Sequence, residues 1–268
     1  MSLSIYTNFY NYLNQCITNQ DEFCKFKTSS HITGITEHPC LDQYKDGFVG
    51  QIVFYADQLH LDVDDVLTSC MINDQYGSPF LSSIVYQNKT YQISPNTLRY
   101  IYNGLHMLLL FKNNKNNKSS ISIVELGGGY GGQCLILYVL TKMLSITITS
   151  YMVIDFYPVC QFITHYLCYF NIHIETNAYL DNHIHDLTNH YDLFISNYCL
   201  GELPFPIQKY YIDKIFNHID SYYIQYNNFW QGGDVHPDLL AKNPTLLPEI
   251  PLTGTDNKLI IGYINKNK

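Results

Sequence analysis

Short apolar runs alternate with segments of helical spacing in the C-terminal half of the chain. An apolar run that begins at residue 121 ends in a glycine-rich turn, and residues 133–144 carry apolar side chains at helical spacing, which predicts a buried strand, a tight turn and a helix. Strands that alternate with helices predict an α/β fold with a doubly wound parallel sheet. Further strands are expected at residues 149–154, 172–175, 191–196, 222–226 and 258–264, the last paired near 246–250, and further helices at 159–170 and 206–219.

The N-terminal part of the chain has a mainly helical pattern instead. Apolar residues recur at helical spacing over residues 3–17 and 98–111 and less regularly over 62–71, whereas residues 34–50 are expected to form a loop. Residues 112–120, KNNKNNKSS, cannot bury apolar surface and mark a boundary. We expect a helical, substrate-selecting cap at residues 1–118 and a second domain with the sheet at 119–268. The alternative for the first part is a dimerisation arm, which would make the protein a homodimer.

The glycine-rich turn predicts a ligand site. Residues 127–132 are glycine except for Tyr130, and Gly127, Gly129 and Gly132 satisfy the dinucleotide pattern G-x-G-x-x-G, which is weak evidence because glycine turns are common. Glu125 discriminates further, since a carboxylate aimed into the turn would repel a pyrophosphate. S-adenosylmethionine carries a sulfonium and an ammonium and no phosphate. We therefore predict S-adenosylmethionine as the cofactor, bound at Glu125, Gly127 and Gly129; the alternative is a structural turn after a core strand.

Two charged residues outside the turn are further candidates for this site. Asp155 follows the second expected strand, where Rossmann-like folds place an acid on the ribose hydroxyls; it could instead cap the helix that starts near Pro158. Arg99 is the only arginine in the chain, and its planar guanidinium can bind a carboxylate or phosphate in a way that lysine cannot. We predict that Arg99 binds the cofactor or the acceptor, with a structural salt bridge as the alternative.

The segment after the fourth expected strand is predicted to carry the chemistry. Asn197 is expected to orient an acceptor hydroxyl, and Tyr198 to contact the cofactor. Glu202 and His236 are the candidate bases, and His236 is preferred because its ordinary pKa suits proton removal at neutral pH, whereas Glu202 would need burial to raise its own. Glu202 could equally be a carboxylate at a helix start, and His236 a surface loop residue.

Several of these segments resemble the sugar O-methyltransferases, a family of class I S-adenosylmethionine-dependent enzymes. The resemblance implies a Rossmann-like class I methyltransferase fold and methyl transfer to the hydroxyl of a nucleotide-linked sugar or a glycan deoxysugar. The chain departs from the family after Asp155, where Phe156 and Tyr157 stand in place of Leu-Pro. The alternative is a non-catalytic module that keeps the fold and binds the cofactor. The matching segments are VELGGGYGGQ at residues 124–133, MVIDFYPV at 152–159, DLFISNYCLGEL at 192–203 and, upstream, NDQYGSP at 73–79 and SPNTLRYIY at 94–102.

Composition narrows the class of partner. A formal charge of −8 and a pI near 5.7 argue against nucleic acid as the substrate. No apolar run is long enough to span a membrane and the N-terminus lacks a signal pattern, so a cytoplasmic protein is expected. The cysteines are scattered without C-x-x-C, and His183, His185 and His190 fall in a polar loop, so no metal site is predicted. Trp230 is either a site residue or a packing residue.

Overall fold

The structure is a computed structural model that describes residues 3–114, 118–179, 183–227 and 234–264. Contacts between Cα atoms divide the chain into two compact units, which interleave in sequence. The helical unit contains Met1–Asn117, Gly129–Ile146 and Tyr157–His173, and the sheet unit contains Lys118–Gly128, Thr147–Phe156 and Ile174–Lys268. Two later segments, Gly129–Ile146 and Tyr157–His173, group with the N-terminal region, so these units do not coincide with the predicted cap at residues 1–118 and second domain at 119–268. That division stays a prediction.

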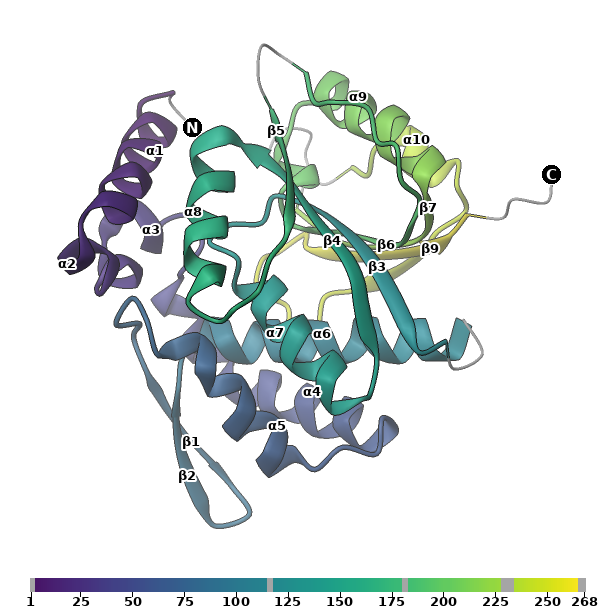
Figure 1. Ribbon diagram of the computed structural model, residues 1–268. Helices are drawn as coiled ribbons and strands as arrows, with labels where there is room; N and C mark the ends of the chain where they lie inside the picture. The colour runs from purple at the N-terminus through teal and green to yellow at the C-terminus, as the bar shows by residue number, and fades with distance from the viewer. Residues whose placement is uncertain (1–2, 115–117, 180–182, 228–233, 265–268) are drawn as a thin grey trace. The chain divides into compact units, whose positions relative to one another are not determined.

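The sheet unit carries a mostly parallel sheet (Figure 1), as the sequence predicts. Within the described residues its strand order is β5-β4-β3-β6-β7-β9-β8. The first five strands in this order are parallel, and β9 runs antiparallel to both β7 and β8. The predicted pairing of the last strand with residues near 246–250 is confirmed. The strands are β3 (Ser120–Leu126), β4 (Thr147–Phe156), β5 (Glu175–Tyr179), β6 (Tyr191–Asn197), β7 (Ile219–Tyr226), β8 (Thr245–Pro248) and β9 (Lys258–Tyr263).

Helices α9 (Phe205–Ile215) and α10 (Pro237–Leu240) lie beside β6 and β7 and cover one face of this sheet (Figure 1). Tyr211, Ile212 and Ile215 share one side of α9 because they recur at helical spacing, and they are buried with Phe194 of β6 in one hydrophobic cluster. Burying an aliphatic or aromatic side chain of this size contributes about 1.5–3 kcal/mol. This cluster holds α9 against β6 and β7.

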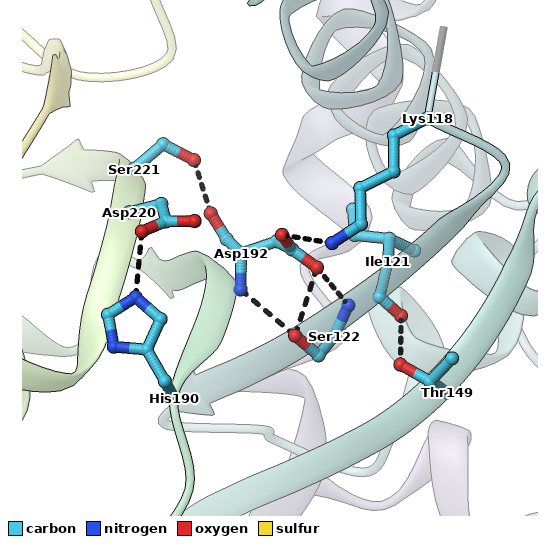
Figure 2. A network of polar contacts seen from close by, with 8 residues as sticks. All are labelled: Lys118, Ile121, Ser122, Thr149, His190, Asp192, Asp220 and Ser221. Carbon is cyan, nitrogen blue, oxygen red and sulfur yellow. Dashed lines mark hydrogen bonds and ion pairs between the residues drawn. The ribbon is translucent and has the colours of Figure 1, made fainter. Parts of the chain in front are cut away.

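The amino ends of β3 and β6 are held by one carboxylate (Figure 2). Asp192 accepts hydrogen bonds at Oδ2 from the backbone N–H and the hydroxyl of Ser122, at 2.9 and 3.0 Å, and its Oδ1 lies 2.7 Å from Lys118 Nζ. Ser221 of β7 donates to the Asp192 carbonyl at 2.6 Å. These hydrogen bonds link β6 to β3 and β7 near the amino ends of the strands. The candidate site is expected at the carboxyl ends, so the role of Asp192 is structural.

Two substitutions in β7 and β9 should change stability in opposite directions. The Tyr222 hydroxyl is buried with no hydrogen-bond partner among the residues that the structure describes, and a Cβ atom at Gly262 would lie 2.7 Å from Tyr222 Cε1. Gly262→Ala should therefore destabilise the protein by about 1–3 kcal/mol through overpacking. Tyr222→Phe should leave stability unchanged or raise it, because it removes a buried unsatisfied group. Urea unfolding followed by circular dichroism tests both; a marked loss in Tyr222→Phe would contradict this assignment.

The helical unit is built around α6, which packs against α4 and α7. Every residue from Pro95 to Leu108 in α6 is buried, the polar residues Asn96 and Arg99 included, so this helix lies in the core of its unit. The predicted helices at 3–17, 62–71 and 98–111 are all present. The elements of this unit are α1 (Leu3–Thr18), α2 (Gln20–Phe23), α3 (Ser30–Thr33), α4 (Lys45–Gln58), α5 (Val63–Cys70), α6 (Pro95–Asn114), α7 (Gly132–Met143), α8 (Tyr157–Cys168), and a hairpin of β1 (Ser82–Tyr86) and β2 (Lys89–Ile93).

The predicted loop at residues 34–50 is wrong over its second half. Residues Pro39–Tyr44 form a 3-10 helix and α4 begins at Lys45. The apolar residues Phe48, Ile52 and Ala56 recur every four positions and are buried, which is the signature of one helix face. Gly50 lies inside this helix with open space around it, so this glycine does not end the helix.

The third strand is also displaced from its predicted position at residues 172–175. The Ile172 N–H still bonds the Leu167 carbonyl after α8, at 3.2 Å, and Asn171 adopts a left-handed φ of 56°, so this segment ends the helix. Strand β5 follows at Glu175–Tyr179 with a polar sequence that carries little apolar pattern. The β1–β2 hairpin is not predicted either, because its turn residues Gln87 and Asn88, both at positive φ, differ from the usual Asn-Gly.

No helix in the described part of the chain combines the length and the apolar character needed to cross a bilayer.

Candidate functional site

The glycine turn starts in the sheet unit, directly after β3. Gly127 has a φ of +82°, and its N–H donates to the Ile154 carbonyl of β4 at 3.0 Å. A Cβ atom there would overlap Cys199 and lie 2.6 Å from its Sγ. Gly127 is therefore required both by the left-handed backbone and by the close approach of Cys199.

Asp155, in β4, binds the same turn. Its Oδ2 accepts from the Gly128 N–H at 3.0 Å, and its Oδ1 accepts from the Phe156 N–H at 2.7 Å. The Gly128 N–H, which would bind a phosphate in a dinucleotide enzyme, is therefore already hydrogen-bonded to the carboxylate of Asp155. This position is the one that the sequence predicts for a ribose-binding acid.

Glu125 is the second carboxyl group near the start of the turn. Its side chain is 1% exposed, and Tyr151 of β4 donates its hydroxyl to Glu125 Oε2 at 2.7 Å. Burial raises the pKa of Glu125 to about 7, with a further upward contribution from the charge of Asp155, while the Tyr151 hydrogen bond acts in the opposite direction. Glu125 therefore gains strongly from any positive charge brought close to it.

Three carboxyl groups act electrostatically on the thiol of Cys199. Burial raises the pKa of Cys199 well above its ordinary value, and the charges of Asp155, Glu202 and Glu125 raise it further, in that order. The thiol is therefore protonated at neutral pH and unsuited to nucleophilic attack. Three of the predicted site residues, distant from one another in sequence, thus act on one buried group of the sheet unit.

Glu202 lies in a single 3-10 turn, Leu200–Glu202, after β6. Asn227, the first residue after β7, donates its side-chain amide to Glu202 Oε1 at 3.0 Å. Burial raises the pKa of Glu202 and the Asn227 hydrogen bond lowers it, with burial the larger effect. Glu202 is half-buried, and the upward direction of its pKa shift is the one that a role as base requires. Asn227 is not among the predicted site residues, although its place immediately after a parallel strand is a usable sequence signal.

Asn197 and Tyr198 come at the carboxyl end of β6. Asn197 is the last residue of the strand and pairs with Gln225 of β7. Tyr198 follows at a φ of +68°, donates its N–H to the Gln225 carbonyl at 2.8 Å, and donates its hydroxyl to Glu249. Both residues lie at the strand edge where the sequence predicts the chemistry.

His236 has a different environment from the other predicted catalytic residues. Its Nδ1 accepts the Asp238 N–H at 3.1 Å and caps α10, and its ring lies 4.8 Å from that of Phe205. The side chain is buried, so His236 is not a surface loop residue. The preceding Gly232 and Gly233, and Trp230, lie outside the described residues.

In the helical unit, the continuation of the turn is anchored by Tyr130. The Tyr130 hydroxyl donates to Glu37 Oε1 at 2.7 Å and accepts from Asn73 Nδ2 at 3.0 Å. Lys27 Nζ lies 4.6 Å from the centre of the Tyr130 ring and donates to the Asn73 carbonyl. Asp74 accepts from the Thr97 hydroxyl at 2.6 Å. We name Lys27, Glu37, Asn73, Asp74 and Tyr130 the anchor network.

The anchor network is buried and charged. Burial lowers the pKa of Lys27, and burial raises the pKa of both Glu37 and Asp74, whereas the attraction between the lysine and the two carboxyl groups acts against these shifts. The network contains residues of the NDQYGSP segment and of the glycine motif, and Asp74 binds Thr97 of the SPNTLRYIY segment. Its chemistry explains why a tyrosine interrupts the glycines: the ring and hydroxyl hold the turn.

Gly129 and Arg99 also belong to the helical unit. Gly129 has a φ of +60°, and a Cβ atom there would lie 3.1 Å from Thr36 Cγ2. Arg99 is buried and donates from Nη2 to Asn96 Oδ1 at 3.1 Å. Burial, together with the charge of Arg99, lowers the pKa of His38 to about 4. Arg99 therefore lies in a buried polar setting, where both its predicted binding role and the structural alternative stay open.

Metal-binding side chains are not gathered in the described part of the chain. No group of three or more His, Cys, Asp or Glu residues there could hold an ion. Of the loop histidines, His190 Nε2 lies 2.7 Å from Asp220 Oδ1 (Figure 2), and the His185 N–H donates to Asn177 Oδ1 at 3.0 Å.

No family model and no curated protein matches the sequence. Among solved structures, the chain is similar to an S-adenosylmethionine-dependent methyltransferase from Clostridium acetobutylicum, at 11% identity and a TM-score of 0.38, over 54% of this chain and 56% of that one. It is also similar to a candidate O-methyltransferase from Nostoc punctiforme, at 12% identity and a TM-score of 0.44, over 97% and 69% of the two chains. A third is ribosomal protein L11 methylase from Lactobacillus delbrueckii subsp. bulgaricus, at 13% identity and a TM-score of 0.41, over 63% and 80%.

Proposed function

We propose that this protein is an S-adenosylmethionine-dependent O-methyltransferase that acts on a sugar hydroxyl. The sheet supports the class of enzyme, because the order β5-β4-β3-β6-β7-β9-β8 with a reversed β9 is typical of class I methyltransferases. The site supports the cofactor, and the motif resemblance supports the sugar.

The observation that carries the cofactor assignment is the pair of carboxyl groups at the turn. Asp155 already accepts the Gly128 N–H, and Glu125 is buried beside it, so a phosphate at this place would meet two repelling groups. A sulfonium and an ammonium would instead be attracted. The glycine turn and the acids therefore fit S-adenosylmethionine better than a dinucleotide.

Each residue proposed to hold the cofactor has its own role. Glu125 is assigned to the positively charged amino-acid end and Asp155 to the ribose hydroxyls, for which it would exchange its present backbone partner. Gly127 and Gly129 shape the turn. Tyr198 and Arg99 complete the cofactor set, with Arg99 proposed for the cofactor carboxylate.

For the chemistry we propose Glu202 as the base and Asn197 as the residue that orients the acceptor hydroxyl. When bound, the cofactor supplies a methyl group on a sulfonium, which is a good leaving group. The protein must therefore align the acceptor oxygen and accept its proton. Glu202 is favoured over His236 because burial raises its pKa towards neutrality, whereas His236 Nδ1 is occupied by the α10 cap.

The acceptor and the cellular setting are proposed on different grounds. The motifs NDQYGSP and SPNTLRYIY resemble those of sugar O-methyltransferases, which favours a nucleotide-linked sugar or a glycan deoxysugar. The acidic composition argues against nucleic acid as the acceptor. We further propose that residues 1–118 take part in acceptor selection and that the enzyme acts in the cytoplasm.

Isothermal calorimetry should show that the purified protein binds S-adenosylhomocysteine and S-adenosylmethionine but not NAD. Asp155→Asn should weaken binding of S-adenosylhomocysteine by about 10-fold or more, because one ligand hydroxyl loses a charged acceptor. The matched control Asp213→Asn changes an exposed α9 carboxylate and should bind as the wild type does. Binding of NAD in place of S-adenosylhomocysteine would overturn the assignment.

A second measurement separates an enzyme from a binding module. Methyl transfer from labelled S-adenosylmethionine to a panel of nucleotide sugars should be lost in Glu202→Gln, while its binding of S-adenosylhomocysteine stays close to that of the wild type. Cofactor binding without transfer to any acceptor on the panel would favour the non-catalytic alternative.

A further inference from the structure

The connection between β8 and β9 lies at the same edge of the sheet as the candidate site. Lys258, the first residue of β9, pairs with Tyr226 at the carboxyl end of β7 and also with Pro248 at the end of β8. Residues 249–257 therefore leave and re-enter the sheet at the carboxyl edge of the parallel strands. Open α/β sheets bind their ligands at this edge.

One buried carboxylate organises this connection. Glu249 is 3% exposed, and its Oε2 accepts from the Thr253 N–H at 2.9 Å, the Thr253 hydroxyl at 2.7 Å and the Asn257 amide at 2.9 Å. Its other oxygen, Oε1, accepts from the Tyr198 hydroxyl. Hydrogen bonds to a carboxylate are stronger than those between neutral groups. Glu249 therefore closes the connection on itself and ties it to the end of β6.

Tyr198 is held in an unusual conformation by this tie. A bulky side chain at a φ of +68° is an outlier that persists only where the surroundings impose it. Here the backbone N–H is fixed by the Gln225 carbonyl at 2.8 Å and the hydroxyl by Glu249. Two anchors at opposite ends of the residue leave one orientation for the ring.

We infer that Glu249 is a positioning residue for the ligand site, which acts through Tyr198 and makes residues 249–257 part of that site. This inference rests on the proposed function, in which Tyr198 contacts the cofactor. Glu249 itself touches no reacting atom. The sheet topology also supports this inference. The connection between the antiparallel strands β8 and β9 lies at the carboxyl edge of the parallel strands, where Asn197 and Glu202 also lie.

The test is a double-mutant cycle on S-adenosylhomocysteine binding, measured by calorimetry. Glu249→Gln keeps a carbonyl for Thr253 and Asn257 but leaves only a neutral amide to hydrogen-bond the Tyr198 hydroxyl, and Tyr198→Phe removes that hydroxyl. Each single variant should raise the Kd about 5- to 10-fold, and the double variant no further, because the charged hydrogen bond between these two residues is lost in both. The matched controls Asp213→Asn and Tyr263→Phe change exposed side chains of the same types and should leave the Kd unchanged.

Hydrogen exchange of the wild type gives an independent measurement if Glu249→Gln folds poorly. Binding of S-adenosylhomocysteine should slow amide exchange in residues 249–257. Additive losses in the double variant, unchanged affinities in both single variants, or no slowing in this segment would each overturn the positioning role while leaving the proposed function intact. Failure of the wild type to bind S-adenosylhomocysteine would overturn the proposed function, and the inference with it.

Discussion

Lys27→Met should lower the free energy of unfolding by about 3–5 kcal/mol at neutral pH, because it removes the cation from a buried charged network and leaves its carboxyl groups behind. Lys27 is 2% exposed and interacts electrostatically with Glu37 and Asp74. Methionine replaces most of the volume of lysine, so the loss reports mainly the charge. Urea unfolding followed by circular dichroism measures it, and Lys25→Met, which changes an exposed lysine, is the matched control.

The loss in Lys27→Met should shrink as the pH falls. Burial already raises the pKa of both Glu37 and Asp74, so without the lysine these groups become neutral at a higher pH than in the wild type. The difference in unfolding free energy between variant and wild type should therefore be smaller at pH 5 than at pH 7.5. A loss below about 1 kcal/mol at pH 7.5, where a broken buried pair is costly, would show that Lys27 is not the counter-charge.

Glu125→Gln should stabilise the protein at alkaline pH and remove part of its pH dependence. Burial raises the pKa of Glu125 from 4.5 in an ordinary setting to about 7, so the folded state binds this proton more tightly than the unfolded chain does. The corresponding stability is fully present below pH 4.5 and is lost as the pH rises through about 7. The loss is on the order of 3 kcal/mol for a shift of this size.

The measurement is urea unfolding of the wild type and Glu125→Gln at pH 5 and pH 8. The wild type should lose more stability than the variant between these values, because glutamine cannot ionise. Glu175→Gln changes an exposed carboxyl at the start of β5 and should follow the wild type. Parallel pH profiles for wild type and Glu125→Gln would mean that Glu125 is ionised in the folded protein already at pH 5.

The sheet could be predicted from the sequence because its strands are apolar runs with clear ends. The strands near residues 121, 149, 191, 222 and 258 all appear close to their expected places. Strand β5 is displaced because its residues, ETNAY, have no apolar alternation, so pairing with β4 alone places it. Helix α4 is missed because Gly50 and the preceding Pro39 resemble loop residues, whereas the burial of Phe48 and Ile52 decides the outcome.

The candidate site was predictable where it depends on strand ends and unpredictable where it depends on distant partners. Glu125, Asp155 and Glu202 follow or end expected strands, and in the structure all three act electrostatically on Cys199. Glu249 and Lys27 carry no local signal, since their roles depend on the Tyr198 hydroxyl and the Asn73 carbonyl, which lie 51 and 46 residues away in sequence. The ordinary pKa of histidine favours His236 as the base, but the sequence does not predict that its Nδ1 accepts the Asp238 N–H at the start of α10.

The interleaving of the two units bears on how such a protein can be shortened or recombined. A chain cut at residue 118 would keep α7, whose packing partner α6 lies in the discarded piece, and the buried side chains Leu137 and Leu140 would face water. Exposed apolar surface of this kind promotes aggregation. A swap of N-terminal regions with another protein of this fold would therefore have to carry the sequences of α7 and α8 as well, because the helical unit consists of three separated segments of the chain.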